Sequence, residues 1–118
     1  MRTIILQKKL SILLPDMEHS IFETNRTALQ SICEKYRVSK LFAFGSVTTV
    51  RFDYDKSDLD LMVELEHMPP IQKGEYLMAI WNELEQLFGR KVDLLTDQPI
   101  QNPYFRSEVF STRQPITI

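Results

Sequence analysis

Two short segments of this chain carry residue types suited to phosphate and metal chemistry. Phe44-Gly45-Ser46 sets a residue without a Cβ before a serine, so a phosphate can approach the backbone and meet a hydroxyl and free N–H groups. Asp58 and Asp60 stand two residues apart, which puts both carboxylates on one side of an extended segment. A bridging divalent cation would relieve their repulsion. A phosphate site beside a Mg²⁺ site predicts nucleotide chemistry.

These residues need strands to position them. Leu41 to Phe44 is wholly apolar and ends at Gly45, which predicts a strand buried on both faces that delivers Ser46 to the site. Residues 58–65 alternate between polar and apolar, which predicts a second strand carrying the carboxylate pair. The run 47–50, Val-Thr-Thr-Val, is rich in β-branched residues, so we expect the helix after Ser46 to be short or irregular.

Other segments predict helices that cover the sheet. A capping-box pattern at Ser20 and Glu23 predicts a helix over about 20–37, with Cys33 on its apolar face. Pro69-Pro70 should open a long helix that Gly89 ends. The residues of this helix that we expect to face the core recur with helical spacing: Tyr76, Leu77, Ile80, Trp81, Leu84 and Phe88.

The last third of the chain predicts one more strand and one more helix. Residues 91–96 should form a strand with Asp93 between two apolar residues, and Asn102-Pro103 should cap a short helix over 104–110. Alternating helices and strands indicate an α/β or α+β fold, a small mixed β-sheet with helices packed on it. The 118 residues fit a single domain, 1–118, in which the structure of 1–18 is left open.

Composition narrows the classes of partner and compartment. A formal net charge of −2 gives no basic excess for broad nucleic-acid binding. No apolar run approaches the roughly 18 residues that a membrane span needs. Cys33 is the single cysteine and cannot form an internal disulfide. We therefore expect the protein to lie in the cytoplasm, where nucleoside triphosphates are available.

The motifs resemble a known family. Phe44-Gly45-Ser46, the run 57–61 (Ser-Asp-Leu-Asp-Leu) and the later 92–94 (Val-Asp-Leu) are similar to the DNA polymerase beta-like nucleotidyltransferase superfamily, most closely its minimal nucleotidyltransferase (MNT) proteins. The resemblance implies a nucleotidyltransferase fold. It also implies that Gly45 and Ser46 bind the triphosphate of ATP.

The resemblance also implies the metal ligands. Asp58, Asp60 and Asp93 would be the catalytic carboxylates and would hold two Mg²⁺ ions, with Asp93 on a neighbouring strand whose register the sequence does not fix. The plain alternative for Asp93 is an aspartate at a sheet edge that pairs with Lys91 or Arg90.

Three functions follow from the resemblance. The first is Mg²⁺-dependent transfer of AMP from ATP to a hydroxyl of a protein partner (AMPylation), with a helical HEPN-type toxin as partner and the chain as its antitoxin; self-association stays open. The second is a catalytically silent module that neutralises its partner by contact, because family members carry an alanine-arginine-glycine run where this chain has 47–50. The third, weaker interpretation is transfer to a small molecule such as an antibiotic.

Overall fold

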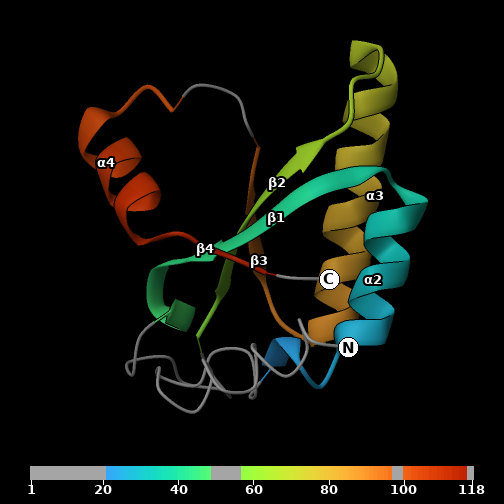
Figure 1. The fold of residues 1–118 in the computed structure, drawn as a ribbon, viewed down its shortest axis with the longest axis horizontal. Helices are drawn as coiled ribbons and strands as arrows, with labels where there is room; N and C mark the ends of the chain where they lie inside the picture. The colour runs from blue at the N-terminus through green and yellow to red at the C-terminus, as the bar shows by residue number, and fades with distance from the viewer. Residues whose placement is uncertain (1–20, 49–56, 97–99, 117–118) are drawn as a thin grey trace, which may run out of the picture.

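The computed structural model describes residues 21–48, 57–96 and 100–116, and the segment 1–18 that the sequence left open lies outside these ranges. The described elements follow the labels of Figure 1. They are, in chain order, α2 (Arg26–Lys35), β1 (Val38–Phe44), the 3₁₀ helix η2 (Gly45–Thr48), β2 (Leu59–Leu65), α3 (Pro70–Phe88), β3 (Val92–Leu95), α4 (Pro103–Thr112) and β4 (Gln114–Pro115).

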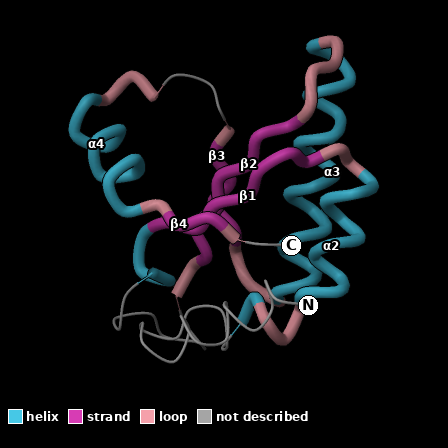
Figure 2. The backbone as a smooth tube through the Cα atoms, in the orientation of Figure 1, coloured by secondary structure: helices cyan, strands magenta, loops and turns pink. Residues whose placement is uncertain are grey.

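The four strands form one mixed sheet in the order β3-β2-β1-β4. β2 pairs antiparallel with β1 and parallel with β3, while β4 adds two residues along the other edge of β1. The predicted small mixed sheet with helices packed on it is confirmed, and the crossover from β2 to β3 runs through α3, as parallel neighbours require (Figure 2).

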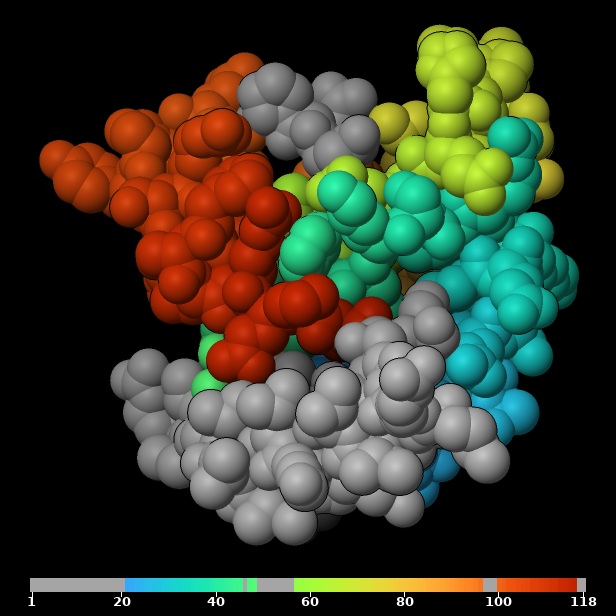
Figure 3. Space-filling model, viewed as in Figure 1, coloured from blue at the N-terminus to red at the C-terminus, as the bar shows by residue number. Residues whose placement is uncertain are grey.

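Helices cover both faces of the sheet. α2 and α3 lie on one face and α4 on the other (Figure 1), and the space-filling view shows α2 and α4 on opposite flanks (Figure 3). The larger core lies under α2 and α3, where Leu59, Leu61 and Val63 of β2 meet Ile80 and Leu84 of α3. The smaller core, Phe44, Met62 and Val109, lies under α4. Met62 is therefore buried on the face where the alternating pattern suggested a polar side.

Both ends of α3 and the start of α4 confirm the sequence signals. α3 starts at Pro70 and ends at Phe88, where Gly89 caps it in the left-handed conformation at φ +63°. Asn102 caps α4 by accepting hydrogen bonds on Oδ1 from the N–H groups of Tyr104 at 2.9 Å and Phe105 at 3.2 Å.

The first predicted helix is interrupted near its start. Ser20 of the capping-box pattern lies outside the described residues, 21–22 form part of a π-helical turn, 23–25 form a turn, and the regular helix α2 begins only at Arg26. The Asn25 side chain donates a hydrogen bond to the Ile21 carbonyl oxygen at 2.8 Å, and such local bonds compete with helix formation. The residues before the turn still belong to the core, since Ile21 and Phe22 are buried and Phe22 meets Phe88 edge to face.

Cys33 is buried on α2, as expected for a core residue. Burial, and then the charge of Glu34, raise the pKa of its thiol to about 11, which keeps it protonated and unreactive near neutral pH. Within the described ranges, none of the helices combines the length and the apolar composition that a membrane span requires.

Candidate active site

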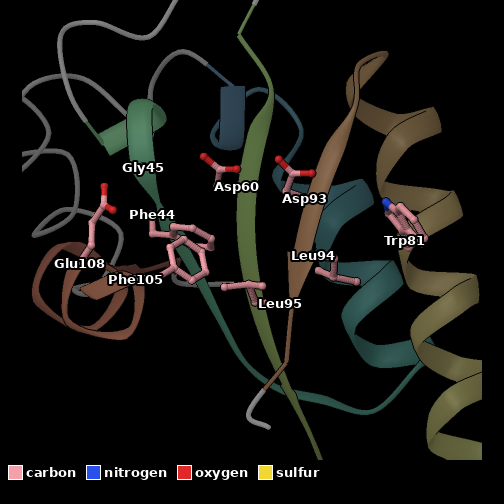
Figure 4. A pocket seen from close by; sticks show the side chains of 9 residues that line it. All are labelled: Phe44, Gly45, Asp60, Trp81, Asp93, Leu94, Leu95, Phe105 and Glu108. Atoms are coloured by element: carbon pink, nitrogen blue, oxygen red, sulfur yellow. The ribbon is translucent and has the colours of Figure 1, made fainter. Parts of the chain in front are cut away.

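Asp60 and Asp93 lie side by side on neighbouring strands. They are register partners in the parallel pair of β2 and β3, so their side chains leave the same face of the sheet. Figure 4 shows the two carboxylates next to each other, with Asp60 on the side of Gly45. The register that the sequence could not fix therefore places two of the three predicted carboxylates together.

The pair has a clear electrostatic signature. Burial contributes most, and a hydrogen bond with Asp93 and the charge of Asp93 come next, raising the pKa of Asp60 to about 6. Smaller contributions come from the negative charges of Asp58 and Glu108. Negative charge thus accumulates around Asp60, which favours a bound cation or a bound proton.

Gly45 makes room for the Asp60 carboxylate. It takes φ +71° at the junction of β1 and η2, a conformation that side chains disfavour. A Cβ at this position would collide with Oδ2 of Asp60. The neighbouring Thr48 Oγ1 donates a hydrogen bond to the Gly45 carbonyl oxygen at 2.7 Å and closes the short 3₁₀ turn. The expectation of a short, irregular helix after the glycine is confirmed.

α3 fixes the start of β3, and with it Asp93. The indole N–H of Trp81 donates to the Val92 carbonyl oxygen at 2.7 Å, and Oε2 of Glu85 accepts from the Val92 N–H at 3.0 Å. On the other side, the Leu59 N–H donates to the Lys91 carbonyl oxygen at 3.0 Å. Both backbone groups of the residue before Asp93 are thus held by α3.

The pocket has a volume of about 500 Å³, within the range of small-molecule sites. It is partly open to solvent, and the side chains that line it come from α4 on one side and from β3 on the other (Figure 4). Its lining combines three acidic residues, a glycine and an apolar wall: Phe44, Gly45, Asp60, Trp81, Asp93, Leu94, Leu95, Phe105 and Glu108.

Three of the five predicted site residues, Gly45, Asp60 and Asp93, line this pocket. Asp58 is exposed, precedes β2 by one residue and acts on Asp60 through its charge. Ser46 belongs to η2, but its side chain lies outside the described part of the structure.

The pocket also contains residues that the sequence did not assign to it. Glu108 and Phe105 come from α4, and no motif linked this helix to the carboxylates. Trp81 was expected in the core, and that expectation is wrong, since the side chain is 41% exposed and lines the pocket. Its helical spacing with Leu84 and Phe88 did not separate a residue at the edge of the buried face from one inside it.

The structure also contains the ion pair with Lys91 that the sequence offered as the alternative role of Asp93. Nζ of Lys91 lies 3.8 Å from Oδ1 of Asp93, and both side chains are about half exposed. An ion pair of this kind contributes about 0–1 kcal/mol, so it does not commit Asp93 to a structural role.

A divalent cation fits the Asp60–Asp93 pair. Among the residues that the structure describes, no three metal-binding side chains gather closely enough to enclose an ion by themselves. Mg²⁺ characteristically takes one or two carboxylates and completes its shell with water and substrate phosphates. The carboxylates of Asp60 and Asp93, which lie in hydrogen-bond contact, supply that share of the ligands.

Proteins of similar sequence identify the class to which this mixed sheet, with its paired aspartates beside a glycine turn, belongs. The chain belongs to the nucleotidyltransferase domain family, whose model matches residues 26–116. This membership confirms the class of enzyme, one that transfers a nucleotidyl group.

Individual relatives support the assignment. The candidate protein adenylyltransferase MJ1379 of Methanocaldococcus jannaschii is 37% identical over 76 residues, which cover 64% of this chain and 74% of that protein. A solved structure of a candidate minimal nucleotidyltransferase is 28% identical, with a TM-score of 0.53, over 80% of this chain and 92% of that one. A toxin–antitoxin structure with AMP-PNP shares the fold at 16% identity and a TM-score of 0.54, over 77% of this chain and 71% of that one.

Proposed function

We propose that this chain transfers AMP from ATP to a hydroxyl group of a protein partner in a Mg²⁺-dependent reaction. The observation that carries the proposal is the register of Asp60 with Asp93 beside Gly45. Support for adenylyl transfer to a protein comes from MJ1379, and support for ATP as donor comes from the neighbour solved with AMP-PNP.

The residues divide the work as follows. The backbone of Gly45, together with Ser46, holds the β- and γ-phosphates, which fixes the triphosphate for in-line attack. Asp58, Asp60 and Asp93 would hold the two Mg²⁺ ions. When bound, these ions supply charge neutralisation for the leaving pyrophosphate and a lowered pKa for the acceptor hydroxyl.

The reaction forms one bond and breaks one. The acceptor oxygen bonds to the α-phosphorus of ATP while the bond from that phosphorus to the oxygen bridging to the β-phosphate breaks, and pyrophosphate leaves. The hydroxyl proton passes to the carboxylate of Asp93, which is exposed and lines the pocket.

The partner that we propose is a helical HEPN-type toxin, with this chain as its antitoxin. Support comes from the fold neighbour, which is a toxin–antitoxin structure. The described elements form a sheet with three helices and a pocket open to solvent, so a partner can present its hydroxyl directly to the carboxylates.

The test is label transfer with purified chain, partner and Mg²⁺. ATP labelled at the α-phosphate should label the partner, ATP labelled at the γ-phosphate should not, and Asp93→Asn should abolish transfer while ATP still binds. Glu64→Gln is a matched control, because it removes a carboxylate from β2 outside the pocket lining. Labelling that persists in Asp93→Asn would contradict the assigned role.

The second candidate is the silent module that neutralises its partner by contact. The observations that favour it are the run 47–50, which replaces the family's alanine-arginine-glycine, and the exposed position of Asp58 outside the pocket lining. A tight complex with an unlabelled partner, unchanged in Asp60→Asn, would establish this candidate in place of the enzyme.

A further inference from the structure

The two aspartates point to the side of the sheet that α4 covers. Asp60 alternates with the core residue Leu61 along β2 and shares its face with Met62, which packs in the smaller core under α4. Asp93 is in register with Asp60 and so leaves the same face. A nucleotide whose phosphates reach this pair therefore has α4 beside it (Figure 4).

α4 presents an aromatic ring and a carboxylate to this space. Phe105 and Glu108 are three residues apart, one helical turn, and both line the pocket. The Phe105 ring meets Phe44 edge to face at 6.2 Å between centroids, while 38% of Phe105 stays exposed. The Asn102 cap fixes the start of the helix that carries both residues.

The chemistry of these two residues differs from that of the phosphate end. A carboxylate repels phosphates but accepts hydrogen bonds from hydroxyl groups, and Glu108 lies close enough to Asp60 for its charge to act there. In the described residues no hydrogen bond or ion pair occupies the Glu108 carboxylate. An exposed aromatic ring next to such a group suits the flat face of a nucleobase.

Trp81 marks the opposite end of the pocket and is less suited to this task. It comes from α3, on the other face of the sheet, and its indole N–H is already bonded to the Val92 carbonyl oxygen. The carboxylates and Trp81 are thus separated by β3 (Figure 4), whereas the carboxylates and α4 share one face.

We propose that α4 forms the nucleoside half of the donor site, in which Phe105 stacks on the base and Glu108 accepts hydrogen bonds from the ribose 2′ and 3′ hydroxyls. This inference rests on the proposed function, because it places the nucleoside of the same ATP. Stacking on an aromatic ring tolerates any base, so this half-site selects a ribonucleoside over a deoxynucleoside more strongly than one base over another.

The experiment is calorimetric titration in Mg²⁺ with three ligands: ATP, 2′,3′-dideoxy-ATP and inorganic tripolyphosphate. Phe105→Ala should weaken ATP binding about tenfold, in line with the loss of one stacking contact, and leave tripolyphosphate binding within about twofold. Glu108→Gln should bring the affinities for ATP and dideoxy-ATP together, whereas the wild type prefers ATP. Tyr104→Ala is the control, since it removes the adjacent aromatic side chain, which is 86% exposed and outside the pocket lining.

A second variant separates binding from folding. Phe105→Leu keeps an apolar contact for Phe44 but removes the aromatic face, so it should lose ATP affinity while keeping its melting temperature near that of the wild type. The inference is overturned if the wild type binds ATP and the Phe105→Leu and Glu108→Gln variants both match its affinity for all three ligands. The proposed function then stands. A wild type that binds neither ATP nor tripolyphosphate overturns both.

Discussion

At the scale of single residues, Gly45 and Asp60 compete for one volume. The Asp60 carboxylate occupies the place that a side chain at position 45 would need, so the conformation of the turn and the position of the carboxylate depend on each other. Gly89 provides a contrast, because it takes a similar φ of +63° but has no atom within 4 Å of where a Cβ would lie.

We predict that Gly45→Ala lowers the free energy of unfolding by more than Gly89→Ala does. Each substitution carries the left-handed backbone cost of about 1–2 kcal/mol, and only the first also displaces Asp60. Urea denaturation of both variants measures the difference. Mg²⁺-dependent ATP binding should fall in Gly45→Ala alone, and equal losses in the two variants would show that the contact with Asp60 is unimportant.

A second prediction concerns pH. The raised pKa of Asp60, about 6, means that the folded metal-free protein holds this proton more tightly than the unfolded chain, whose aspartates have a pKa of about 3.9. The stabilisation is complete below about pH 4 and is lost as the pH rises to about 6. The melting temperature of Asp60→Asn relative to wild type should therefore rise across this interval in chelator. A pH-independent difference would contradict the raised pKa.

At the scale of elements, α3 acts as a clamp for β3. The Trp81 indole and the Glu85 carboxylate hold the two backbone groups of Val92, one residue before Asp93. These two bonds explain how a strand of four residues at the edge of the sheet can fix the position of the Asp93 side chain.

We predict that Trp81→Phe costs about 1 kcal/mol of stability, the value of one neutral hydrogen bond, yet lowers turnover by more than this loss of stability explains. Faster hydrogen exchange at the amides of Leu94 and Leu95 would show that β3 has loosened. Met78→Leu is the matched control, because Met78 lies on α3, is 62% exposed and lies outside the pocket lining. Unchanged exchange with reduced turnover would assign Trp81 a direct role in binding instead.

The same scale shows what the sequence could predict. Pro69-Pro70, Gly89 and Asn102-Pro103 act on their own neighbours, so the ends of α3 and the start of α4 were predictable. The start of α2 was not, because a turn interrupts the helix before Arg26 and the Asn25 side chain bonds to the Ile21 carbonyl oxygen, neither of which the capping pattern shows.

The site residues also differ in whether a local pattern could predict them. Gly45, Asp58 and Asp60 follow from one short motif. The alignment of Asp93 with Asp60 needs the pairing of β2 with β3, and the approach of Glu108 needs the docking of α4. Such contacts are set by packing across the sheet, which local patterns do not encode.

At the scale of the whole molecule, the sheet separates two tasks. The larger core under α2 and α3 holds the strands in register, while α4 and the smaller core form a wall of the pocket. A ligand bound in this pocket should therefore raise the free energy of unfolding of the entire fold.

We predict that Mg²⁺ and ATP together raise the melting temperature by several degrees, since a ligand at 100 times its Kd stabilises by about 2.7 kcal/mol. Excess chelator should abolish the shift. The double variant Asp58→Asn with Asp60→Asn should lose the shift while its metal-free melting temperature stays equal or rises, because like-charge repulsion is removed. A lower metal-free melting temperature would show that these aspartates are structural.

The two outer strands are poorly suited to recruit a further strand. β4 contains two residues, one of them Pro115, which has no N–H to donate, and at the start of β3 the N–H and carbonyl of Val92 are already bonded to α3. Short, blocked edges limit aggregation through strand addition. Because of these edges, a protein that binds at this pocket would have to be recognised through surface side chains and not by pairing with a strand. Such a protein could bind and dissociate without disturbing the backbone hydrogen bonds of the sheet.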